Sequence, residues 1–345
     1  MSEVTIIIPL FDRHEHTERI LGYYNLHKVE YTFFLADGSK KKKFNQKYFD
    51  IKFPFVKIFY KSFPADKNCN SYAKKMLNIS KKIKSKYVYQ VANDDFFNPL
   101  FIKKAEKFLD KNKDYSFVGG IVRNVRIIQL FKPINDFGII RFQKENQYHN
   151  YKGIYKNINH SNFKKRVIFC LSSLPFESVL TKKAYNEVWK LINEFKVNNF
   201  HEIDWFLMMI PLVHGKKKLL KIISTIRQSN TFSGLGLFNV TSEAATLKRF
   251  DQYLEFLYNK KIIKTKLLIS QIKLSTFYKV SVDSNQREKK KINFLLKKIC
   301  YQMYINIKNL VFKVNYLLTF FIFLIYKNKY DSLYDKIYRA FNGKK

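Results

Sequence analysis

The chain has 345 residues, and its 64 Lys and Arg against 27 Asp and Glu give a formal net charge of +37. A hydrophobic content of 46% at this length is ample for one catalytic-sized domain and an appendage. Its three cysteines, Cys69, Cys170 and Cys300, are far apart, which excludes a cysteine zinc site and favours a reducing compartment.

The N-terminal residues predict alternating strands and helices. Residues 4–8 form a β-branched run that Pro9 ends, which is typical of a buried strand. Because this strand begins almost at the first residue, no signal peptide is expected. A helix is expected over residues 14–24, a second strand over 31–36, a third over 56–60 and a basic helix over about 70–84. The second strand leads into Asp37-Gly38-Ser39, a carboxylate followed by a turn glycine.

The most informative stretch is residues 87–96, an apolar alternating strand that delivers Asn93, Asp94 and Asp95 to its C-terminal end. Residues 96–99 should then turn the chain. Adjacent carboxylates repel each other unless a cation or strong donors offset them, and hard divalent ions prefer such oxygen ligands and share them with a diphosphate. A solvated acidic turn explains the motif equally well, because Asp and Asn favour turns.

The order of these elements, β-α-β-loop-β-α-β, implies a mostly parallel sheet with helices on both faces, an α/β fold. Ligands of such sheets bind outside the carboxyl ends of the strands. Phe11-Asp12-Arg13, Asp37 and Asp94-Asp95 all follow strands, so they should converge on one crevice.

Three segments in this order, residues 4–13, residues 35–39 and Asn93-Asp94-Asp95 before Phe-Phe-Asn-Pro, resemble the inverting family 2 glycosyltransferases of bacterial surface-polysaccharide synthesis. The resemblance covers roughly residues 4–240 and implies a nucleotide-sugar-binding domain of the GT-A type. It implies that Asp37 contacts the nucleotide base and that Asp94 and Asp95 hold Mn²⁺ or Mg²⁺. The other residues implied to contact the donor are Pro9, Phe11, Asp12, Arg13, Asn93, Asp94 and Arg227.

Sugar transfer needs a base for the acceptor hydroxyl, and Glu202 and Asp204 at the start of an apolar helix are the candidates. Without the resemblance, the simpler interpretation is that these two acids cap the helix and interact with its dipole. The resemblance favours a catalytic role, with Asp204 preferred because it directly precedes Trp205. The helix should run to Pro211 or slightly beyond.

A strand expected over residues 219–226 leads into Arg227. Without the resemblance, the simpler interpretation is that this arginine is a surface charge. The resemblance implies instead that it holds the β-phosphate of the donor as the nucleotide leaves. Residues 231–236, with two glycines, predict a loop that orders over bound nucleotide. Residues 120–173 are rich in Gln, Asn, His and Tyr, which suits an acceptor-binding insertion and equally a surface insertion without a role.

Beyond about residue 240 the chain becomes a basic, apolar helical region. The apolar stretch 316–326 is too short to span a bilayer, so it suits an interfacial helix and equally a bundle or homo-oligomer contact. With the positive charge, this predicts a cytoplasmic protein, peripheral at the inner face of the cytoplasmic membrane where anionic lipid is present. The chain is thus divided into a catalytic domain, 1–240, and a helical region, 241–345.

The sequence therefore predicts a metal-dependent glycosyltransferase that uses a nucleotide sugar, UDP-sugar first, and a glycan or lipid-linked glycan acceptor. One alternative is a nucleic-acid-binding protein, suggested by charge and by 17% aromatic residues. Most aromatics lie in core-like patterns and no binding motif is present, so no nucleic-acid partner is expected. The other alternative, a nucleotidyltransferase, lacks the glycine-rich loop expected after the first strand.

Overall fold

The computed structural model describes residues 3–129, 138–142, 157–162, 166, 177–228, 243–265, 269 and 333–342. The strands are β1 Val4–Leu10, β2 Thr32–Asp37, β3 Lys57–Ser62, β4 Tyr87–Gln90, β5 Phe96–Phe97, β6 Tyr115–Gln129, β7 Gly138–Phe142, β8 Ser178–Thr181 and β9 Lys216–Gln228. The helices are α1 His14–Leu26, α2 Gln46–Lys52, α3 Cys69–Lys82, α4 Pro99–Lys111, α6 Lys182–Phe195, α7 Phe200–His214, α8 Glu243–Asn259 and α10 Leu333–Phe341.

The described strands form one nine-stranded sheet in the order β3-β2-β1-β4-β8-β6-β9-β5, with β7 beside β6. The first four strands are parallel, as expected for β-α-β connections. Farther along, β8 runs antiparallel to both β4 and β6, while β9 is parallel to β6. The α/β class is therefore confirmed, and the sheet is mixed, since β5–β9 and β6–β7 are also antiparallel pairs.

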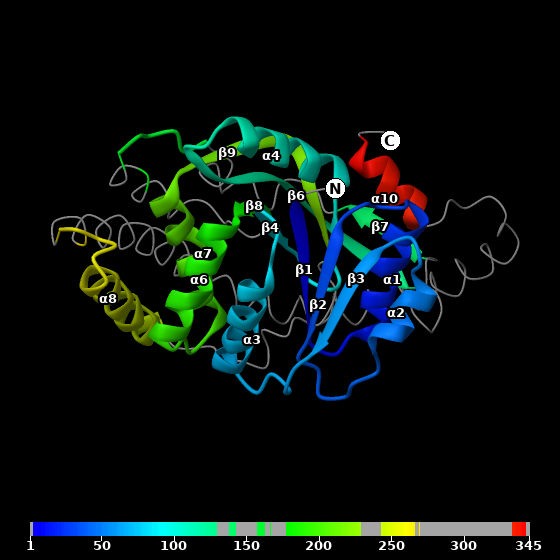
Figure 1. The fold of residues 1–345 in the computed structure, drawn as a ribbon, viewed down its shortest axis with the longest axis horizontal. Coiled ribbons are helices and arrows are strands. Elements are labelled where there is room, and N and C mark those ends of the chain that lie inside the picture. The colour runs from blue at the N-terminus through cyan, green and yellow to red at the C-terminus, as the bar shows by residue number, and fades with distance from the viewer. Residues whose placement is uncertain are drawn as a thin grey trace, which may run out of the picture.

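Helices cover both faces of the sheet, with α3, α6, α7 and α8 on one side and α1, α2 and α10 on the other (Figure 1). Successive side chains of strand β1 point to opposite faces of the sheet, so this strand contributes to the core on both sides. Ile6 and Ile8 enter the core beneath α1, whereas Ile7 enters the core beneath α3. All three are fully buried, which accounts for the unbroken apolar run.

Pro9 lies inside β1 and does not end it. Leu10 points its carbonyl at β2, where it accepts from the amide of Gly38, so Pro9 faces the β4 side. After Gln90, opposite Ile7, only the amide of Val91 still donates to the carbonyl of Ile7, so Pro9 lies where the β1–β4 pairing ends and its missing N–H costs at most the next bond. Pro211 is likewise tolerated within α7, which continues to His214.

Seven of the described elements have no counterpart in the sequence analysis: helices α2, α4 and α6 and strands β5, β6, β7 and β8. Helix α2 occupies part of the expected loop between the second and third strands, and its Asn45 accepts from the amide of Tyr48 as an N-cap. Phe96 and Phe97 do not simply turn the chain: as β5 they pair with β9. The turn comes afterwards, where Asn98 caps α4 and Pro99 is its first residue.

The described parts of region 241–345 pack on the two cores already outlined. Leu254 and Leu257 of α8 are buried with α6 and α7, and Ile337 and Phe341 of α10 are buried against the core of α1. Expectations for residues 231–236 and 316–326, and for Cys170 and Cys300, lie outside the described residues. Where the structure describes the chain, no helix is both long and apolar enough to cross a membrane.

Candidate active site

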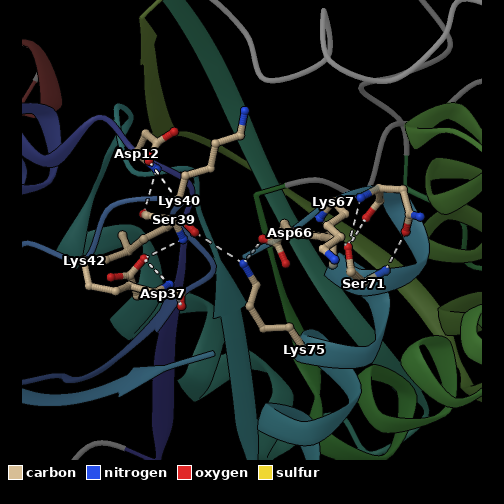
Figure 2. A network of polar contacts seen from close by, with 12 residues as sticks. Asp12, Asp37, Ser39, Lys40, Lys42, Asp66, Lys67, Ser71 and Lys75 are labelled. Atoms are coloured by element: carbon tan, nitrogen blue, oxygen red, sulfur yellow. Dashed lines mark hydrogen bonds and ion pairs between the residues drawn. The ribbon is translucent and has the colours of Figure 1, made fainter. Parts of the chain in front are cut away.

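The carboxyl ends of β1 and β2 are joined by hydrogen bonds (Figure 2). The hydroxyl of Ser39 accepts from the amide of Asp12 at 2.7 Å, and the carboxylate of Asp12 accepts from the amide of Lys40 at 3.2 Å. Asp12 and Arg13 have positive φ angles of 53° and 55°, an unusual backbone for two successive residues other than glycine. The bonds to the β2 loop hold this turn, and Arg13 then starts α1. Pro9 and Phe11 flank the turn, both half-buried.

The buried side chain of Asp37 accepts hydrogen bonds that hold the loop after β2 in place. Its carboxylate is fully buried and accepts from the amide of Ser39 at 2.8 Å and from the hydroxyl of Tyr60 at 2.7 Å. Lys42 donates to its carbonyl at 2.8 Å. Burial alone would raise the pKa of Asp37, but the hydrogen bonds from Ser39 and Tyr60 outweigh it, so the pKa is lowered.

We expect Asp37→Asn to lower the free energy of unfolding at neutral pH by about 1–3 kcal/mol, since buried donors on Ser39 and Tyr60 lose an ionised acceptor. The folded pKa lies below the unfolded one, so this stabilisation is present above the unfolded pKa and is lost as pH falls through the folded value. Urea denaturation at several pH values should show wild type and Asp37→Asn converging in acid. A constant difference at every pH would contradict this.

An ion pair between Asp66 and Lys75, each almost fully buried, lies behind the same loop (Figure 2). Lys75 also donates to the carbonyl of Leu10 at 3.3 Å, and the amide of Asp66 donates to Gly38 at 2.9 Å. A Cβ on Gly38 would lie 2.2 Å from an Asp66 carboxylate oxygen and 2.6 Å from the Lys75 ammonium. The turn glycine is therefore required by close approach, and the pair fixes the loop against β1.

The Asn93-Asp94-Asp95 motif meets the β1 turn, as its position after a parallel strand predicts. The Asn93 amide donates to the carbonyl of Asp12 and to the hydroxyl of Thr17, both at 3.2 Å. Arg13 donates to the carboxylate of Asp94 at 2.6 Å. The segment containing these residues follows β4, so the ends of β1, β2 and β4 meet at one edge of the sheet.

Asp95 belongs to a second group of charges, with Glu177 and Arg227. Its carboxylate accepts from the amide of Gln228 at 2.9 Å, and its other oxygen lies 4.0 Å from Nε of Arg227. Arg227 also pairs with Glu177, whose carboxylate accepts from Nε at 3.0 Å. Glu177 is buried and has a φ of 63°, so its backbone is strained at this contact.

The carboxylates here outnumber the arginines that contact them. Burial raises the pKa of Asp95 well above its usual value, the nearby charges of Asp94 and Glu177 raise it further, and Arg227 offsets this only in part. Such under-compensated oxygen donors fit a divalent cation. In the described part of the chain, no group of three or more His, Cys, Asp or Glu side chains is arranged around a metal position. Asp94 and Asp95 would thus supply part of a coordination sphere that Mg²⁺ commonly completes with phosphate and water.

The two acids of α7 have different surroundings. Glu202 is fully buried, and both its carboxylate oxygens pair with Arg249 of α8, at 2.8 and 3.1 Å. Asp204 is half-buried. Burial raises the pKa of Asp204 to about 7, while the positive charge of Arg227 lowers it in part. Asp204 is therefore electrostatically linked to the arginine that contacts Asp95.

Four residues of this region escaped the sequence analysis: Asp66, Lys75, Glu177 and Arg249. For Lys75 the sequence contains a hint of burial, because this lysine lies in a helix beside Ala73 and Met76, which are buried. Lysine at a buried helical position needs a partner. Glu177 and Arg249 carried none, because their partners are 50 and 47 residues away.

No family model matches the sequence, and no curated protein matches it. Among solved structures, the chain is similar to S. aureus TarS 1-349 in complex with UDP-GlcNAc, with 10% identity, coverage of 79% of this chain and 78% of that one, and a TM-score of 0.45. For the same fragment in complex with UDP, the identity is 13%, the coverage is 77% of this chain and 76% of that one, and the TM-score is 0.45. For the longer S. aureus TarS chain they are 12%, 77%, 46% and 0.42, so this chain spans about half its length. Values this low describe a distant likeness of fold and nothing finer.

Proposed function

We propose that the chain is a glycosyltransferase that moves a sugar from a nucleotide-sugar donor to an acceptor hydroxyl with inversion at the anomeric carbon. The observation that carries this proposal is the charge arrangement from Asp94 to Asp204. Arg227 lies beside Asp95 and Glu177 and acts on Asp204, whose pKa is about 7. A base with a pKa near the working pH and a fixed cation near the leaving group are the two requirements of such a transfer.

The donor would lie along the ends of β1, β2 and β4. The Asp12-Arg13 turn and the Gly38-Ser39 loop are rigidly joined there and would bind the nucleoside. Arg13 contacts Asp94, and Arg227 contacts Asp95. Both arginines would therefore be close to a diphosphate bound at these two carboxylates. Their fixed charges would stabilise the diphosphate, and Asp94 and Asp95 would hold the divalent ion. That ion would add positive charge where the leaving diphosphate becomes more negative.

In the transfer, a carboxylate oxygen of Asp204 accepts the proton of the acceptor hydroxyl while the hydroxyl oxygen forms its bond to the anomeric carbon. The bond from that carbon to the β-phosphate oxygen breaks, and its electron pair leaves with the nucleoside diphosphate. Arg227 offsets the developing charge. Attack opposite the leaving group inverts the configuration. Glu202 is the poorer base, because both its oxygens are already paired with Arg249.

The wider setting follows from the sequence resemblance and the charge. We propose a glycan or lipid-linked glycan acceptor, a role in surface polysaccharide synthesis, and an anionic membrane surface as a secondary partner for the basic region 241–345. UDP and UDP-GlcNAc, with which the TarS fragment was crystallised, are the first probes to use.

The proposal predicts that UDP with Mn²⁺ stabilises the protein more than an oligonucleotide does. Saturating nucleotide at about 100 times its Kd adds about 2.7 kcal/mol to the free energy of unfolding, which thermal shift detects readily. A panel of nucleotide sugars with Mn²⁺ should then show release of nucleoside diphosphate from at least one donor. Stabilisation by oligonucleotide alone would indicate nucleic-acid binding, and pyrophosphate release from a nucleoside triphosphate would indicate a nucleotidyltransferase.

A further inference from the structure

Helix α8 contacts the first turn of α7 through an ion pair between the half-buried Arg249 and the buried Glu202. Glu202 is fully buried, and the Arg249 guanidinium meets its carboxylate with two nitrogens, Nε at 3.1 Å and Nη2 at 2.8 Å. The same carboxylate accepts from the amide of Asn198 at 3.0 Å and from the side chain of Asn199 at 3.2 Å. The two-pronged geometry fixes direction as well as distance, which a lysine would not do.

The other contacts of Arg249 extend this junction to the end of α6. Its Nη2 donates to the carbonyl of Lys196 at 3.3 Å, and its guanidinium lies 4.4 Å from the ring centroid of Phe195. Lys196 itself has a left-handed φ of 58°, where α6 ends. One side chain of α8 therefore joins the end of α6 to the beginning of α7.

Asp204 lies between two contacts with α8. On its N-terminal side is the pair of Glu202 with Arg249, and on its C-terminal side is Trp205. The ring of Trp205 packs 5.0 Å from Phe250, and its carbonyl accepts from the hydroxyl of Tyr253 at 3.0 Å. Any movement of α8 must therefore change the placement of the segment that carries Asp204.

We propose that Arg249 is a positioning residue for the transfer: by pairing with Glu202 it holds the first turn of α7 and so fixes the segment that carries Asp204. This inference rests on the proposed function, in which Asp204 is the base. It makes α8, which lies beyond the expected domain boundary near residue 240, part of the catalytic unit. Glu202 then serves as the ion-pair partner of Arg249 and does not accept the proton of the acceptor hydroxyl.

The test compares Arg249→Met, which leaves a buried carboxylate without its partner, with the double variant Glu202→Gln and Arg249→Met, which removes both charges. The matched control is Lys248→Met, an exposed cation one residue earlier. We expect Arg249→Met to lower kcat for transfer about 10–100-fold, because small misplacements of a catalytic group have effects of this size. Donor affinity by calorimetry should stay unchanged. The double variant should regain Tm, because no buried carboxylate is left unpaired, but it should keep the lowered kcat, because it still lacks the pair. Lys248→Met should match wild type.

A second readout needs no activity. Hydrogen exchange at the amides of Asn198 and Glu202 should quicken in Arg249→Met and in the double variant, and it should stay at the wild-type rate in Lys248→Met. If wild type transfers no sugar, the proposed function fails while the exchange data still decide whether Arg249 orders this turn. Unchanged kcat and exchange in Arg249→Met would overturn the inference. Wild-type kcat in the double variant would also overturn it, because the pair would then not be needed to place Asp204. A loss of donor affinity as large as the loss of kcat would overturn it as well. If Arg249→Met does not fold, the double variant, which leaves no unpaired buried charge, is compared with Lys248→Met.

Discussion

Asp204→Asn is expected to slow sugar transfer by about 10²–10⁴-fold while donor affinity stays close to that of wild type. The amide cannot accept the acceptor proton, but it matches the carboxylate in size, and the base contacts the acceptor and not the donor. Initial rates with saturating donor and calorimetric titration with nucleoside diphosphate separate the two effects. The anomeric configuration of the wild-type product, read by NMR, should be inverted.

The pH dependence of the wild type provides an independent check. Asp204 is active when ionised, and its pKa is raised to about 7, so kcat should rise with pH up to about this value and then level off. In Asp204→Asn this rise should disappear. The folded pKa lies above the unfolded one, so the protonated group favours folding and the wild type loses stability as pH rises from about 4 towards 7. Asp204→Asn should therefore be more stable than wild type at pH 8 and differ little in acid.

Glu202→Gln is the control for Asp204→Asn. Its carboxylate is buried and paired with Arg249, so its loss should act on stability and on the placement of α7, but the rise of kcat with pH should remain. Nearly normal transfer by Asp204→Asn, or a product with retained configuration, would rule out the single displacement with Asp204 as base.

Replacing Asp94 or Asp95 with Ala is expected to abolish metal-dependent turnover of the nucleotide sugar without unfolding the protein. The two carboxylates are the proposed ligands of the divalent ion, and the pKa of Asp95 is raised by burial and by the nearby Asp94 and Glu177. Because its surroundings disfavour the charge of Asp95, this carboxylate contributes little to folding, and Asp95→Ala should leave Tm near that of wild type. Turnover against Mn²⁺ concentration and direct Mn²⁺ titration by calorimetry measure the two losses.

The matched control for these variants is Asp110→Ala. Asp110 lies on α4, where its carboxylate accepts from the hydroxyl of Tyr87, and it is not among the proposed donor or metal contacts. It should keep wild-type turnover and Mn²⁺ dependence. If Asp94→Ala and Asp95→Ala both behave as Asp110→Ala does, the metal and diphosphate lie elsewhere.

Much of the N-terminal fold could be read from the sequence, because its signals are local. The apolar run of β1 and the helical spacing of α1 each specify an element within a dozen residues. Parallel connections then bring strand ends to one edge, which is why Arg13 and Asp94 meet although 81 residues separate them. Strand β5 had no such signal: it has two residues, and its pairing with β9 depends on a strand more than a hundred residues later.

The sequence by itself determined that carboxylates would gather at the strand ends and that Glu202 and Asp204 would open a helix. Only the tertiary structure gives those two acids different surroundings. Residues two apart on an α-helix point about 200° apart around its axis, so they cannot face the same neighbour. Here α8 supplies Arg249 to Glu202, whereas Asp204 is left within the field of Arg227. The helix pattern fixes their opposite directions, but which helix packs on which face is set by long-range contacts that no local motif encodes.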